Sequence, residues 1–236
     1  MNRLKVIFVE DISYGFSKNI IRKWKSKLFK VTVGSGMFKP GAMPDLLENY
    51  GYSDEKLRLY LVEKHGERDC ESYDLKFFVV NVPLAEDCFS RIISKDTIVI
   101  SYYDIKDILE TEGLPLENYL LSSLYTYFFL YRNYAPFVED GIVHQVSRGC
   151  IFDYCGNKRE VIYSCNEPKI CDNCKINLVE RGVPIGEIIR ANKEMKCLRR
   201  RKIDQLKRNP ILYMIVFSIL LPLLVSIIAS IIYELL

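Results

Sequence analysis

The sequence lacks the short motifs that mark the common catalytic folds. It contains no HExxH, no GxGxxG, no P-loop and no GxSxG. It therefore carries no signature of a zinc metalloprotease, a dinucleotide-binding fold, a P-loop nucleotidase or an α/β-hydrolase. Histidine is also scarce, since His65 and His144 are the only two. These two residues cannot assemble an HExxH pair, so no catalytic residue is assigned and we expect a non-enzymatic protein.

Charged side chains are absent from residues 211–233. As an α-helix rising about 1.5 Å per residue, this segment would extend about 34 Å, against about 30 Å for a bilayer core. We therefore expect one C-terminal transmembrane helix over 211–233, with a kink at Pro222.

Acidic residues are rare just before that segment. Between Lys193 and Arg208 there are eight basic side chains and two acidic ones. This basic juxtamembrane segment, residues 191–210, predicts contact with anionic membrane lipids and a cytoplasmic N-terminal body. The segment carries a local charge of +6 and the whole chain +3, which leaves −3 elsewhere, so nucleic acid is not an expected partner. The opening residues do not predict a secretory signal, and we expect a single-pass, tail-anchored membrane protein.

Apolar runs and helical spacing alternate through residues 1–138. Strands are expected at residues 4–9, 29–33, 74–82 and 97–101, and helices at 16–28, 54–64, 104–110 and 116–134. This alternation predicts an α/β domain with a mainly parallel sheet and flanking helices. Glu10, Asp11 and Asp104 follow expected strands. Because ligands bind beyond the carboxyl ends of strands in open α/β sheets, these three residues are candidates for a ligand pocket.

Cysteine is concentrated in one segment. Five of the eight cysteines lie between Cys150 and Cys174, and in a reducing compartment such a cluster indicates metal binding. We expect a zinc module over residues 139–190, built on Cys171-x2-Cys174. Tetrahedral Zn²⁺ needs four nitrogen or sulfur ligands. Spacing favours adding Cys150 and Cys155, which would form a zinc ribbon. The competing set is His144, Cys150, Cys171 and Cys174, and Cys165 is a further alternate.

The stretch from His144 through SRGCIFDYCGNKREVIYS to KICDNC resembles a block in a little-characterised prokaryotic family. In that family a His, an Arg-Gly-Cys-x-Phe-Asp block and a late Cys-x2-Cys recur together. The similarity covers about 35 residues, and it implies the ligand set with His144, because the positions of Cys155 and Cys165 are not cysteine there. Arg148 and Asp153 flank Cys150. They either form a local salt bridge or orient a ligand, His144 above all.

The order of elements is also loosely similar to archaemetzincin-type zinc peptidases, although the decisive HExxH is missing. We expect a structural Zn²⁺ and a binding or assembly role with a protein partner or in a homo-oligomer. Ser226-x3-Ser230 would allow close helix packing in such an oligomer. The pathway expected is prokaryotic stress or antiviral defence. Two alternatives stay open, a sensor of a nucleotide or other small ligand and a hydrolase related to zinc peptidases.

Overall fold

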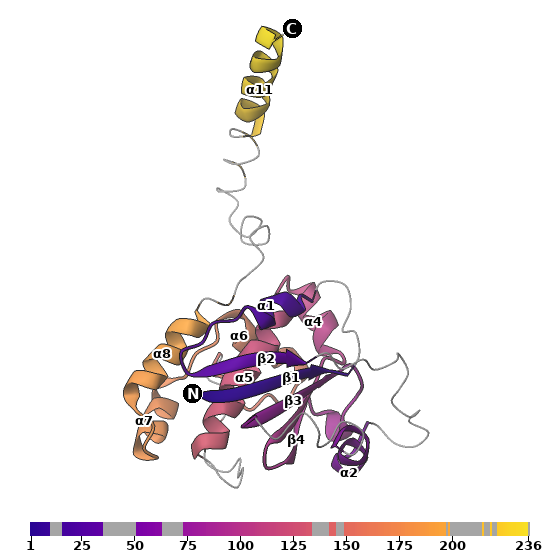
Figure 1. Cartoon of the computed structure of the whole chain (residues 1–236), viewed down its shortest axis with the longest axis vertical. Coiled ribbons are helices and arrows are strands. Elements are labelled where there is room, and N and C mark those ends of the chain that lie inside the picture. The colour runs from indigo at the N-terminus through magenta and orange to yellow at the C-terminus, as the bar shows by residue number, and fades with distance from the viewer. Residues whose placement is uncertain are drawn as a thin grey trace. The chain divides into compact units, whose positions relative to one another are not determined.

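The structure is a computed structural model of the 236-residue chain. It describes residues 1–9, 16–34, 51–62, 73–133, 142–144, 149–196, 198, 214, 218 and 221–235. The chain divides into two compact units, Met1–Leu198 and Arg199–Leu236, and each is described by itself. Elements keep the labels of Figure 1.

A five-stranded sheet with the order β2-β1-β3-β5-β4 lies at the centre of the first unit (Figure 1). The strands are β1 (Asn2–Phe8), β2 (Phe29–Gly34), β3 (Leu75–Val80), β4 (Ser90–Ser94) and β5 (Thr97–Ser101). The pairings of β1 with β2, of β1 with β3 and of β3 with β5 are parallel, and β4 pairs antiparallel with β5. The predicted α/β fold with a mainly parallel sheet is confirmed. The edge strand β4 was not predicted, because only Ile92 and Ile93 give it apolar character.

Side chains alternate between two buried faces of this sheet, as the pleat of a strand requires. In β1, Leu4, Val6 and Phe8 join the core on one face, and Ile7 joins the core on the other. The larger core contains the long helix α5 (Leu116–Asn133), and the smaller one contains α2 (Asp54–Leu57) with the π-helical turn η1 (Arg58–Val62). Burial on both faces explains the continuous apolar runs of the central strands.

The remaining helices of the first unit are shorter. They are α1 (Lys18–Arg22), η2 (Ala85–Asp87), α4 (Ile105–Thr111), η3 (Lys158–Glu160), α6 (Val161–Asn166), α7 (Asp172–Glu180) and α8 (Ile185–Met195). The helix expected over residues 16–28 is thus limited to five residues. Its continuation is prevented because Ser26 Oγ and the Lys27 N–H donate to the carboxylate of Glu194, at 2.7 and 2.9 Å.

The zinc ribbon predicted with Cys150 and Cys155 is wrong. A zinc ribbon is built on a β-hairpin, and the segment after Cys155 that would supply a strand of this hairpin is helical, as η3 followed by α6. The physical reason is a capping box in which Asn157 Oδ1 accepts the Arg159 N–H and Glu160 Oε2 accepts the Asn157 N–H. The larger core contains residues from both sides of position 138, so the cysteine-rich segment packs on the α/β elements (Figure 1). The boundary predicted near residues 136–141 lies outside the described residues.

The predicted transmembrane helix is also wrong. Among the described residues, no helix has both the length and the apolar character needed to span a bilayer. The second unit contains α11 (Leu221–Leu235). Pro222, expected in mid-span, lies in α11. Most of the basic segment 191–210 lies outside the described residues.

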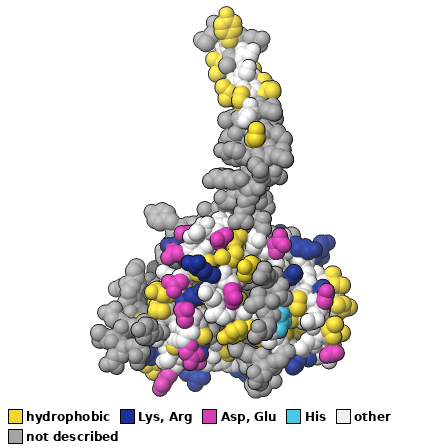
Figure 2. Space-filling model, turned by 180° about the vertical axis from the view of Figure 1, so that it is seen from behind, with side chains coloured by type: hydrophobic (Ala, Val, Ile, Leu, Met, Phe, Trp, Pro, Cys, Tyr) yellow, Lys and Arg dark blue, Asp and Glu magenta, His cyan; other side chains and the backbone are white. Residues whose placement is uncertain are grey.

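Charges of both signs are mixed on the surface of the first unit. Figure 2 shows Lys and Arg side chains interspersed with Asp and Glu, rather than gathered by sign, on the face that it presents.

Candidate metal centre

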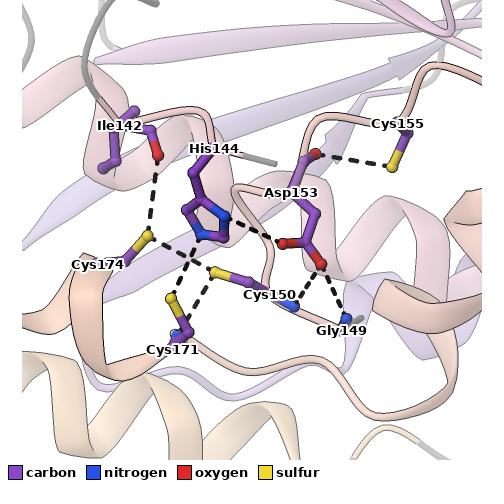
Figure 3. Close-up of polar contacts among 8 residues, drawn as sticks. All are labelled: Ile142, His144, Gly149, Cys150, Asp153, Cys155, Cys171 and Cys174. Atoms are coloured by element: carbon purple, nitrogen blue, oxygen red, sulfur yellow. Dashed lines mark hydrogen bonds and ion pairs between the residues drawn. The ribbon is translucent and has the colours of Figure 1, made fainter. Parts of the chain in front are cut away.

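Four side chains that could hold one metal ion converge in the cysteine-rich segment: His144, Cys150, Cys171 and Cys174. Their ligand atoms, three sulfurs and one ring nitrogen, all lie within 4.8 Å of one another. Cys150 Sγ is 3.8 Å from Cys174 Sγ, and Cys171 Sγ is 3.3 Å from His144 Nε2 (Figure 3). The sulfurs are free thiols, since a disulfide would bring two of them to about 2.05 Å. Of the two ligand sets left open by the sequence, the structure brings together the one with His144.

The start of α7 positions two of the ligands. Cys171 is the N-cap residue of this helix and Cys174 lies in its first turn, so the two-residue spacing brings both sulfurs to one side.

A short backbone bridge positions the third ligand. Lys169 lies two residues before Cys171, and its N–H donates to the Gly149 carbonyl at 3.0 Å. This hydrogen bond holds Cys150 beside the start of α7. Gly149 has a φ of +119°, and a Cβ there would lie 3.2 Å from a backbone carbonyl oxygen. Only glycine is readily accommodated at this turn.

Asp153 links His144 to the turn that carries Cys150. Its Oδ2 accepts the Gly149 and Cys150 N–H groups at 2.9 and 3.0 Å, and its Oδ1 lies 3.5 Å from His144 Nδ1 (Figure 3). The side chain of Asp153 is only 4% exposed. A proton on Nδ1 would therefore face a fixed carboxylate while Nε2 faces the sulfurs. This is the usual way in which an outer carboxylate orients a metal-binding histidine.

The two buried sulfurs of Cys150 and Cys174 have opposite pKa shifts. The hydrogen bond between them, with the Cys171 N–H as a further donor to Cys150, outweighs burial and lowers the pKa of Cys150 to about 5. The hydrogen bond to Cys150 and burial together raise the pKa of Cys174. A bound cation would favour the thiolate form of both.

The alternate ligands lie apart from this cluster. Cys155 Sγ donates to the carbonyl of Asp153 at 3.7 Å, and burial raises its pKa to about 12. Cys165 is fully buried in α6, where burial raises its pKa. Two residues considered in the sequence, His65 and Arg148, lie outside the described part of the chain.

The predicted ligand pocket at the strand ends is not brought together in the described residues. Glu10 and Asp11 lie outside them. Asp104 directly precedes α4, and its Oδ2 accepts a hydrogen bond from Lys158 Nζ at 3.1 Å.

Lys158 is a residue that sequence reasoning missed. Its side chain is 8% exposed, forms ion pairs with Asp87 and Asp104, and lies 5.3 Å from the centre of the Tyr103 ring. Burial acts to lower the pKa of Lys158, but hydrogen bonds to the two carboxylates outweigh it and raise that pKa. The only signal in the sequence was the Asn157–Glu160 capping pattern around Lys158. This pattern predicts a helix start but does not indicate which carboxylates Lys158 would pair with.

Comparisons of the chain with protein families, curated proteins and solved structures return no match. The geometry of the site therefore carries the functional argument.

Proposed function

We propose that this protein is a non-enzymatic binding protein, organised by one structural zinc ion held by His144, Cys150, Cys171 and Cys174. The observation that carries the proposal is the convergence of these four ligand atoms within 4.8 Å. The ligands come from three separate stretches of the cysteine-rich segment, so one ion would cross-link that segment beneath α5.

Zinc fits the donor set better than other common ions. Three thiolates and one imidazole are soft or borderline ligands, which disfavours Mg²⁺ and Ca²⁺. In a tetrahedral site with Zn–S bonds of about 2.3 Å, two sulfurs are about 3.8 Å apart. The distance between Cys150 Sγ and Cys174 Sγ is 3.8 Å.

A structural role fits better than a catalytic one. Four protein ligands fill a tetrahedral shell and leave no position for an activated water. Cys150 and Cys174 are buried, which also limits access of a substrate. This ligand count disfavours the hydrolase alternative. The expectation of a protein partner or homo-oligomer in a stress or defence pathway stays a prediction.

Metal analysis of the purified full chain tests the proposal. We expect about one zinc per chain in the wild type, and a much lower content in His144→Ala and Cys171→Ser, because each variant removes one of four ligands. Cobalt substitution should give the visible absorption of a tetrahedral thiolate-rich site in the wild type, and this absorption should be weakened or lost in His144→Ala and Cys171→Ser.

Cys155→Ser is the matched control. It removes a neighbouring thiol that lies outside the cluster, so the zinc content should equal that of the wild type. A wild-type chain without metal, or equal loss of metal in Cys155→Ser and Cys171→Ser, would refute the assignment.

A further inference from the structure

A cavity of about 280 Å³ lies between α5, the start of β4 and the segment that follows Cys150. Residues 150–156, which include the metal-ligand candidate Cys150, form part of its wall. Its volume is close to the lower limit of typical small-molecule sites. The size therefore suits a ligand of one or two rings.

Small hydroxyl residues make room for the cavity along α5. Ser122, Ser123 and Thr126 line it, on a helix whose other core positions are mostly Leu, Tyr and Phe. Ser122 and Ser123 donate to the Tyr119 carbonyl at 3.0 and 2.8 Å, and Thr126 donates to the carbonyls of Ser122 and Ile151, both at 3.1 Å. A hydroxyl has one proton, so these three oxygens have only lone pairs left for a ligand. The wall thus offers hydrogen-bond acceptors.

Carboxylates outnumber cations where the cavity meets solvent. Glu86 and Asp87 line the cavity, and their side chains are 78% and 77% exposed. Lys158 forms ion pairs with both Asp87 and Asp104. Arg91 forms ion pairs with both Glu86 and Asp54. Each cation therefore faces two carboxylates. Among the residues that line the cavity, three carry a carboxylate, Glu86, Asp87 and Asp153, and one carries a cation, Lys158.

The backbone at this opening is held in an unfavourable conformation. Glu86 and Asp87 have φ values of 59° and 56°, and among the described residues Asp104 is the only other non-glycine residue with positive φ. Such conformations are strained and persist where the surrounding structure enforces them, often at ligand sites. Here they occur at two consecutive carboxylate residues that line the cavity and are exposed to solvent.

Aromatic rings line the interior. Tyr119, Tyr127 and Phe89 contribute to the wall, with the rings of Phe89 and Tyr119 in an edge-on arrangement at 6.4 Å. Aromatic faces attract cations and also bury flat apolar groups.

We propose that this cavity binds a small organic cation, a protonated amine on a flat apolar body, with the amine toward Glu86 and Asp87 and the body among the aromatic rings. The proposal rests on the proposed binding function and supplies its ligand class. The metal centre would support the site indirectly, by fixing residues 150–156 in the cavity wall.

Three probes with one ring and different charges test the proposal. Binding of benzylammonium, benzyl alcohol and benzoate to the zinc-loaded full chain is measured by isothermal titration calorimetry at neutral pH. Benzylammonium should bind about tenfold or more tightly than benzoate, with benzyl alcohol between them. Equal or tighter binding of benzoate, or no binding of benzylammonium, would overturn the proposal.

A cavity-filling variant locates the site. Ser123→Leu should abolish benzylammonium binding, because the larger side chain occupies the cavity. Thr111→Leu is the matched control, since Thr111 on α4 also donates to a carbonyl four residues earlier at 2.8 Å but does not line the cavity. Unchanged binding in a folded Ser123→Leu protein would refute the location.

Zinc content measured on the same samples separates the two proposals. Zinc-loaded protein that ignores benzylammonium contradicts the cavity proposal alone. Absence of zinc with retained benzylammonium binding contradicts the metal proposal alone.

Discussion

Single polar side chains connect parts of this chain that lie far apart in sequence. Asp153 joins His144 to the turn before Cys150, and Lys158 joins the cysteine-rich segment to Asp87 and Asp104 near the carboxyl ends of the strands. Both side chains are less than a tenth exposed. The partners of Asp153 and Lys158 are charged or metal-binding groups. Removal of either side chain would therefore weaken the contact between the segments that it joins, as well as local stability.

Asp96 gives a pH-dependent prediction at this scale. Burial acts to raise its pKa, but hydrogen bonds from Lys76 and two neighbouring hydroxyls outweigh burial, so the pKa lies below its usual value. A carboxyl with a lowered pKa in the folded state stabilises the fold above the unfolded pKa of about 3.9, and this contribution is lost as the pH falls through the folded pKa.

We therefore expect Asp96→Asn to be less stable than the wild type at pH 7, and the difference to shrink as the pH falls below about 4. Urea unfolding from pH 7 to pH 2.5 measures this difference. Asp107→Asn, on the exposed side of α4, is the control for the change in charge. A stability difference for Asp96→Asn that stays constant with pH would contradict the assignment.

At the scale of elements, α8 is held to the sheet layer by one carboxylate. Glu194 accepts hydrogen bonds from Ser26 Oγ, the Lys27 N–H and Tyr125 Oη, at 2.7, 2.9 and 2.7 Å. These donors come from the connection before β2 and from α5. The carboxylate therefore joins three elements in one contact.

Glu194→Ala should lower the free energy of unfolding by about 2 kcal/mol, because two partly buried hydroxyl donors and one exposed N–H lose their acceptor. Glu187→Ala in the same helix is the matched control. It removes only a partly exposed ion pair with Arg132, worth less than about 1 kcal/mol. Chemical denaturation of both variants measures the effects, and equal losses would show that the Glu194 contact is not special.

The elements that the sequence predicted well are those with strong local patterns. The buried runs of β1, β3 and β5, and the long apolar helix α5, lie within two residues of their expected bounds. The short α1 could not be predicted, since Glu194 is 168 residues from Ser26, whose hydroxyl it accepts. The helical η3 and α6 were missed because β-branched residues outweighed the Asn157–Glu160 capping pattern.

The metal ligands were predicted only as two competing sets. Cys155 lies near Cys150 in sequence, so spacing alone favoured it. In the structure its sulfur faces the carbonyl of Asp153. The direction of the Cys155 thiol depends on the backbone turn that carries it. That turn depends on the contact between Asp153 and His144, which spacing in the sequence does not reveal.

At the scale of the whole molecule, the metal should contribute a large share of the stability of the first unit. If free zinc exceeds its dissociation constant about a thousandfold, binding adds about 4 kcal/mol to the free energy of unfolding. Removal of zinc by a chelator should lower the urea midpoint accordingly.

Hydrogen exchange should show which part of the first unit loses stability when zinc is removed. Amides of Lys158–Glu180 should exchange faster after chelation, while those of β1 and β3 should stay protected. Cys171→Ser is the control and should respond little to the chelator. An equal gain in exchange across the sheet would indicate that the ion supports the entire unit rather than the cysteine-rich segment.

The order of the ligands along the chain has a consequence for biosynthesis. All five strands lie before residue 102, and α5 ends at Asn133, whereas the last ligand is Cys174. The ribosome therefore supplies a complete sheet and its covering helix before the ion can be fully coordinated. Until then the outer side of α5 lacks the segment that packs on it. Zinc supply during translation would thus determine how long this nascent surface is available to chaperones and proteases.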